Sequence, residues 1–196
     1  MPRQGLTRET VIRTAIEMID SKGVASFSMV ALAKALHVKT ASLYNHIESL
    51  EVLYSAVALS AIAQMVQAEE AAAAGKSGDA ALWALASAYR SFAREHYHLY
   101  RFILAALGRD NPELEQAAAA VIQPILRILS GYGLCREQQV HWQRILRSVM
   151  HGFVAHETAG GFSHFPIGSD ESYRLAIQWI TAAVAAAGKD GEHERG

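Results

Sequence analysis

The sequence has 196 residues, 51% of them hydrophobic, and a formal net charge of −1 at neutral pH. Frequent alanine, only four prolines and no strand-like alternation predict an all-helical protein. No charge-free apolar stretch reaches the ~18 residues of a membrane span, and no apolar signal region opens the chain, so we expect a cytoplasmic protein. The single cysteine, Cys135, excludes an intrachain disulfide, and we expect it to be a small core residue rather than a redox sensor.

Charge is unevenly distributed along the chain. Residues 1–50 carry six basic and four acidic side chains, a net charge of +2, so the remaining residues carry −3. The asymmetry is small. A mildly basic N-terminal part followed by a mildly acidic body is compatible with a small domain that reads nucleic acid.

The first expected helix covers residues 8–22. Thr7 is a good N-cap, Glu9 lies in the first turn where the helix dipole favours a negative charge, and Gly23 is a typical C-terminal residue. The apolar residues that recur at helical spacing, and should form its buried face, are Val11, Ile12, Ala15, Ile16 and Ile19.

Residues 28–47 contain two short helical patterns separated by a tight break. The apolar stripe of the first pattern, which Ser28 can cap, consists of Met29, Leu32, Ala33 and Leu36. At the break, His37 stands where such a turn usually has glycine, and histidine tolerates a positive φ better than most residues. The second pattern buries little more than Leu43 and Ile47, so it cannot be stable alone and must dock on the helix before it. Such a pair is either a helix-turn-helix, whose second helix enters a DNA major groove, or a plain surface hairpin.

The second helix of this pair has a polar outer side. With Leu43 at the centre of the buried face and about 100° per residue, Ala41 and Asn45 point away from the core. The side chains placed to reach base edges are Ala41, Ser42 and Asn45. Those placed to reach phosphate oxygens are Lys39, Thr40, Tyr44 and His46. Ser28, at the start of the preceding helix, could add a backbone N–H contact to phosphate.

These residues form a specific motif. It reads Phe27-Ser28-Met29-x-x-Leu32-Ala33-x-x-Leu36-x-Val38-x-x-x-Ser42-Leu43-Tyr44-Asn45-His46-Ile47, followed by Leu50 and Leu53. Over roughly residues 7–54 it resembles the N-terminal domain of TetR/AcrR-type transcriptional repressors. The resemblance implies three N-terminal DNA-binding helices and a six-helix body that binds a small molecule and dimerises.

The sequence departs from the pattern of that family at two places. The family often has glycine where this chain has His37. It also often has a lysine just before the fourth helix, where this chain has Glu48-Ser49-Leu50-Glu51. The two glutamates would repel phosphate if they faced it, which disfavours a phosphate contact at that position.

Six further helices are expected after residue 48. They cover residues 49–74, 79–96, 99–107, 112–130, 136–158 and 170–187. Pro124 should kink or divide the helix that contains it. Gly188 should end the last helix, and the tail after Lys189 should be disordered.

Residues 142–162 resemble the WHG-type C-terminal domain of one branch of the family. The residues that carry this resemblance are Trp142, Arg147-Ser148-Val149-Met150-His151-Gly152-Phe153 and Gly160-Gly161-Phe162. The body is also rich in large apolar and amphipathic side chains, each of which alone is better explained by core packing. As a set they could line a mainly apolar effector cavity: Trp83, Tyr89, Phe92, His96, Phe102, Trp142, Met150, His151 and Phe153. His96 and His151 are its polar handles.

We expect no cofactor, no metal site and no catalysis. The nine histidines include the pairs His96/His98 and His151/His156, whose spacings do not place both rings on one helix face. The P-loop, GxSxG and GxGxxG motifs are absent.

Apolar faces on residues 136–158 and 170–187 exceed the need of one bundle, which favours a four-helix interface in a homodimer. We expect a helix-turn-helix DNA-binding domain at residues 1–48, a ligand-binding and dimerisation domain at 49–188 and a disordered tail at 189–196. The expected function is a transcriptional repressor that binds a near-palindromic double-stranded DNA operator and is released by a small apolar or aromatic effector. The alternative is a helical small-molecule-binding or protein-interaction module that has lost DNA binding.

Overall fold

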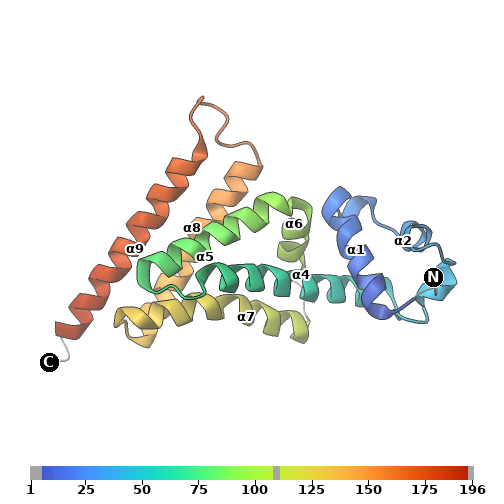
Figure 1. The fold of residues 1–196 in the computed structure, drawn as a ribbon, viewed down its shortest axis with the longest axis horizontal. Helices are drawn as coiled ribbons and strands as arrows, with labels where there is room; N and C mark the ends of the chain where they lie inside the picture. The colour runs from blue at the N-terminus through green and yellow to red at the C-terminus, as the bar shows by residue number, and fades with distance from the viewer. Residues whose placement is uncertain (1–5, 108–110, 194–196) are drawn as a thin grey trace. The chain divides into compact units, whose positions relative to one another are not determined.

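The computed structural model describes residues 6–107 and 111–193, and regular secondary structure in them is helical throughout (Figure 1). The all-helical prediction is therefore confirmed, and these described residues contain nine α-helices, as expected. The chain divides into two compact units. The first comprises residues 1–64 and 96–118, and the second comprises residues 65–95 and 119–196.

The first unit holds the three N-terminal helices together with all or part of three later helices. Its elements are α1 (Arg8–Lys22), the 3-10 turn η1 (Val24–Ser26), α2 (Met29–Ala35), α3 (Thr40–Leu43), the start of α4 (Leu50–Ala73), α6 (Tyr97–Ala106) and the start of α7 (Pro112–Leu129). Thr7 caps α1 by accepting a hydrogen bond from the Thr10 backbone N–H at 3.2 Å, as predicted. α1 contacts α6, and His96 Nδ1 lies 2.7 Å from Asp20 Oδ2. The core residues of this unit include Val11, Ala15, Ile19, Leu32, Leu43, Ile47, Leu53, Leu99 and Ile103.

The second unit is a helical bundle in which α5 contacts both α8 and α9. Its elements are the end of α4, α5 (Gly78–Glu95), the end of α7, the 3-10 turn η2 (Ser130–Tyr132), α8 (Arg136–Thr158) and α9 (Ser169–His193). Its core residues include Leu82, Leu85, Ala86, Met150, Val154, Tyr173, Ile177 and Val184. Periodic apolar residues on each helix meet in this core, as the sequence pattern requires.

The last helix is longer than the sequence predicted. α9 continues to His193, so the predicted stop at Gly188 is wrong and residues 189–193 belong to the helix; residues 194–196 lie outside the described part of the chain. A Cβ atom added at Gly188 would come within 1.8 Å of the carbonyl oxygen of Tyr132. Glycine is therefore needed here for the close approach of α9 to η2, and not to end the helix.

Two other local predictions need correction. Cys135 is exposed rather than part of the core, because it stands at the N-cap of α8, where its backbone N–H donates to Gln138 Oε1 at 2.9 Å. Of the two outcomes predicted for Pro124, the division of its helix is wrong, since α7 runs unbroken from Pro112 to Leu129, and the kink stays a prediction.

Among the described residues, α4 is the one helix whose length and composition would suffice to cross a membrane, with a mean hydropathy of 1.3 in its most apolar window. Length and composition alone do not show that a helix spans a membrane, so the expectation that no segment does so stays a prediction. The same composition suits the core helix of a globular protein. Leu53, Val57 and Met65 of α4 are indeed buried inside the protein.

Candidate nucleic-acid interface

The turn between α2 and α3 is closed by His37 in the left-handed conformation. Its φ of 55° is the one positive φ of a non-glycine residue in the part of the chain that the structure covers. The backbone N–H of His37 donates to the Lys34 carbonyl at 3.2 Å, and that of Val38 donates to the Ala33 carbonyl at 3.0 Å. These are the two bonds of a Schellman motif. His37 therefore takes the position of the usual glycine, as predicted, with a Cβ atom in a backbone that disfavours it.

α3 docks on α2 through the two predicted residues. Leu43 and Ile47 are 0% and 1% exposed. The regular α-helix covers only Thr40–Leu43, which is shorter than expected, and residues 44–46 form a turn. The backbone N–H groups of His46 and Ile47 both donate to the Leu43 carbonyl, at 2.9 and 3.0 Å, so this turn still carries Ile47 back into the core.

The outer side of residues 39–46 is polar. Its exposed residues are Lys39, Ala41, Tyr44 and Asn45, and its half-buried residues are Thr40, Ser42 and His46. Ser28 is engaged as the N-cap of α2, where its hydroxyl accepts from the Ala31 backbone N–H at 3.1 Å. The other polar side chains of the predicted set form no hydrogen bond with described residues: Lys39, Thr40, Ser42, Tyr44, Asn45 and His46. Their donors and acceptors are therefore available to DNA.

Acidic side chains lie near this polar side. Glu48 and Glu51 are exposed, and Glu51 lies in the first turn of α4, where the helix dipole favours it. Ser49 caps the helix through its hydroxyl. Hydrogen bonds from its own backbone N–H and from Thr7 lower the pKa of Glu9, and Arg8 and then His46 add smaller electrostatic contributions. Since the residues immediately before α4, Glu48 and Ser49, include no lysine, a phosphate contact there would need backbone N–H groups.

The nine side chains predicted to bind an effector are divided between the two units. His96 and Phe102 lie in the first unit. The second unit holds Trp83, Tyr89, Phe92, Trp142, Met150, His151 and Phe153. Core packing accounts for the buried Tyr89, Phe92 and Met150, whereas Trp83 and His151 are exposed.

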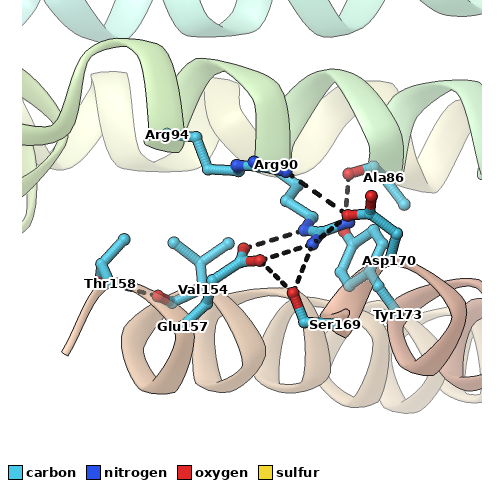
Figure 2. A network of polar contacts seen from close by, with 9 residues as sticks. All are labelled: Ala86, Arg90, Arg94, Val154, Glu157, Thr158, Ser169, Asp170 and Tyr173. Carbon is cyan, nitrogen blue, oxygen red and sulfur yellow. Dashed lines mark hydrogen bonds and ion pairs between the residues drawn. The ribbon is translucent and has the colours of Figure 1, made fainter. Parts of the chain in front are cut away.

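A polar network that the sequence did not suggest joins α5, α8 and α9 (Figure 2). Arg90 donates to the two carboxylate oxygens of Glu157 at 2.5 and 2.9 Å, to Asp170 Oδ1 at 2.8 Å and to Ser169 Oγ at 3.1 Å. The Ser169 hydroxyl donates to Glu157 at 2.6 Å. The guanidinium also lies 4.9 Å from the ring centre of Tyr173. The hydrogen bond from Arg90 lowers the pKa of Glu157, so this carboxylate stays charged in the bundle.

The sequence did not predict the burial of two further polar side chains in the second unit. Glu69 on α4 and Gln143 on α8 are 1% and 6% exposed, and the Oε1 atom of each has no hydrogen-bond partner among the described residues. Burial raises the pKa of Glu69 to about 8. Both residue types are usually found at the surface, so the sequence pattern carries no signal for their burial. In residues 6–107 and 111–193, no three His, Cys, Asp or Glu side chains are grouped to hold a metal ion.

A short polar helix docked through a tight turn on an all-helical frame defines the class of helix-turn-helix DNA-binding proteins. Comparisons with known proteins narrow the class. Residues 82–180 match the family described as "Tetracyclin repressor-like, C-terminal domain". The chain is 37% identical over 156 residues to the uncharacterized HTH-type transcriptional regulator Rv0681 of Mycobacterium tuberculosis, which covers 79% of this chain and 72% of that protein.

Two further proteins support the same assignment. The HTH-type transcriptional regulator YobS of Bacillus subtilis is 32% identical over 153 residues, covering 78% of this chain and 80% of its own length. The fold is shared with the transcriptional regulator SCO7222, a TetR from Streptomyces coelicolor, with a TM-score of 0.75, 17% identity and coverage of 93% and 99% of the two chains.

This chain therefore belongs to the TetR family of helix-turn-helix transcriptional regulators, and it is a DNA-binding transcriptional regulator. The resemblance stated for its N-terminal motif is confirmed. Its C-terminal part is confirmed as a TetR-type C-terminal domain.

Proposed function

We propose that the protein is a homodimeric repressor that binds a near-palindromic double-stranded operator and is released from it by a small apolar or aromatic effector. The observation that carries the DNA-binding assignment is the exposed polar side of residues 39–46 above the buried pair Leu43 and Ile47. The residues assigned to base edges are Ala41, Ser42 and Asn45. The residues assigned to phosphate oxygens are Lys39, Thr40, Tyr44 and His46, with a backbone N–H at Ser28.

Exposed apolar side chains on the last two helices support the homodimer. Ile145 on α8 and Leu175 on α9 are 44% and 41% exposed, and Trp179 on α9 is 74% exposed. A tryptophan this exposed among other apolar groups is typical of an interaction surface. A two-fold dimer would present two reading helices to two half-sites, which is why the operator should be near-palindromic.

We assign DNA binding to residues 1–48 and ligand binding and dimerisation to residues 49–188. The effector site would be formed by the nine side chains predicted for it in the sequence analysis. For the buried members of this set, core packing is the alternative role. The role is regulatory rather than enzymatic, and the place of action is the cytoplasm.

Operator selection from random double-stranded DNA with the purified full chain tests this function. We expect an enriched near-palindrome, with Asn45→Ala relaxing the preference at one base per half-site at a cost of about 1–3 kcal/mol. Tyr44→Ala should weaken binding to all sequences alike, because a phosphate contact carries no base information. Gln67→Ala, which changes an exposed amide on α4, is the matched control.

No enriched palindrome, or binding insensitive to both substitutions, would refute the repressor. A weak and salt-insensitive mobility shift would instead favour the alternative of a helical binding module that no longer reads DNA. The exposed Glu48 and Glu51 are the features that favour this second candidate.

A further inference from the structure

The first unit contains a cavity of about 410 Å³, and of the nine side chains proposed for the effector site only Phe102 lines it. Residues 22–25, at the end of α1 and in η1, form one side of it. Tyr54 and Ser55 of α4, the 98–106 stretch of α6 and Leu114 of α7 form the others. All of these residues belong to the first unit, and the volume lies within the usual range of sites for small organic molecules, about 300–1,000 Å³.

Part of the lining of this cavity is apolar and well ordered by packing. Phe102, Ala106 and Leu114 are 6%, 5% and 2% exposed. The Tyr54 ring meets Phe102 edge-on with ring centres 5.5 Å apart, and its other neighbour is Phe27 at 5.8 Å. These rings offer an apolar contact surface to the body of a ligand.

The charged part of the lining has a single sign. Its ionisable basic groups are Lys22, His98 and Arg101, and no Asp or Glu side chain lines the cavity among the described residues. Neither Lys22 nor Arg101 forms an ion pair with a described carboxylate, and within residues 6–107 and 111–193 the Arg101 guanidinium donates a hydrogen bond only to the Tyr97 hydroxyl, at 3.3 Å. An anionic group placed here would meet cations without displacing an existing carboxylate.

Gly23 lies close to His98, one of these basic groups. Its φ is 76°, and a Cβ atom there would lie 3.2 Å from Nδ1 of His98. Only a glycine allows the imidazole to approach the end of α1 this closely without a shift. The basic groups of α1 and α6 therefore converge on the same cavity.

We propose that this cavity binds a small organic carboxylate, with the carboxylate at Arg101 and Lys22 and an aromatic or short aliphatic body against Phe102 and Leu114. The planar guanidinium of Arg101 suits two parallel hydrogen bonds to a carboxylate. Because residues 22–25 lie shortly before α2, which begins at Met29, the occupant also contacts the segment that leads into the helix-turn-helix. An effect of the bound carboxylate on DNA binding would rest on the proposed function, whereas the binding of the carboxylate to the cavity does not.

Calorimetric titration of the purified full chain tests the binding. The probes are octanoate and phenylbutyrate, each compared with its neutral alcohol, octanol or phenylbutanol. At least one carboxylate should bind at least about tenfold more tightly than its alcohol, and Arg101→Gln should remove this preference. Ala105→Trp, which fills the cavity from an exposed position on α6, should abolish binding of both members of each pair. Arg144→Gln, which removes an exposed arginine of the second unit, should leave binding unchanged.

Equal affinity for acid and alcohol, no measurable binding of either carboxylate, or unchanged binding by Arg101→Gln would overturn the proposal. Thermal unfolding of each variant shows whether it is folded. If Ala105→Trp is unfolded, the result for Arg101→Gln alone decides whether the proposal stands. A mobility shift with the selected operator separates the proposed carboxylate site from the proposed repressor function. Carboxylate binding in a protein that selects no operator supports this cavity while refuting the repressor, and operator binding without carboxylate binding does the reverse.

Discussion

Glu69 is a carboxyl group buried in the second unit, and no described residue donates a hydrogen bond to its Oε1 atom. It is 1% exposed on α4, and burial raises its pKa from 4.5 to about 8; Arg147 opposes this change and Glu70 adds to it. Glu69→Gln keeps the size and polarity of the side chain but removes its ionisation. The substitution therefore isolates the free energy of placing a negative charge at this site.

The size and sign of the effect follow from proton linkage. Between pH 4.5 and about 8 the folded protein binds a proton at Glu69 that the unfolded chain has lost, so stability falls as the pH rises through this window and is level above it. The difference between the two pKa values corresponds to about 5 kcal/mol, of which water entry and relaxation at the site relieve a part. Glu69→Gln should therefore be more stable than the wild type by about 3–5 kcal/mol near pH 9, and within about 1 kcal/mol of it near pH 5.

Guanidinium unfolding followed by circular dichroism at about pH 5, 7 and 9 measures this difference, at one fixed protein concentration because the stability of the proposed dimer would depend on it. Subtracting wild type from variant cancels the titration of every other group. Glu95→Gln, an exposed change at the end of α5, is the control and should follow the wild type at each pH. Parallel pH profiles for wild type and Glu69→Gln would refute the argument, because they would mean that Glu69 is already ionised and solvated in the folded state.

Three further substitutions test local features. His37→Gly should stabilise the protein by about 0.5–1 kcal/mol, because it removes the Cβ atom from a backbone with a φ of 55°. This relief of strain should exceed the cost of the added flexibility of glycine in the unfolded chain, and a lower thermal midpoint would contradict this expectation. Gly188→Ala should destabilise it by about 1–3 kcal/mol, because the methyl group meets the Tyr132 carbonyl, and an unchanged denaturation midpoint would show that α9 is free to move. Arg90→Met should cost about 3 kcal/mol near neutral pH by leaving the largely buried Glu157 without its ion-pair partner. This loss should shrink as the pH falls through the lowered pKa of Glu157, and a pH-independent loss would assign the effect of Arg90 to packing alone.

Local chemistry explains which parts of the helix-turn-helix could be predicted. Thr7 and Ser28 cap helices through atoms only three residues away, and His37 closes its turn through neighbouring carbonyls. The burial of Leu43 and Ile47 follows from one i, i+4 pair in a segment with no other apolar choice. Each of these predictions needs only the sequence within one or two turns.

The missed features depend on residues far apart in the sequence. Arg90 meets Glu157 and Asp170 across 67 and 80 residues, and Gly188 is required by a carbonyl on another element. Hydropathy patterning assigns Arg and Glu to the surface, so it cannot foresee that Arg90 or Glu69 is buried. His96, chosen as a polar handle for an effector, instead lies against Asp20 of α1, a contact that the spacing of neighbouring residues could not reveal.

Connectivity also limits how an event in one unit can reach the other. The chain passes between the units at three points, after residues 64, 95 and 118, and the first and last of these lie inside the continuous helices α4 and α7. Glu69 is little more than one turn along α4 from the boundary with the DNA-binding unit. The i to i−4 hydrogen bonds of α4 run without a break across this boundary, so α4 is a covalent and hydrogen-bonded route between the two units. Backbone amide exchange of residues 50–73 measures whether a ligand or proton that acts on the second unit changes the protection of α4 in the first unit.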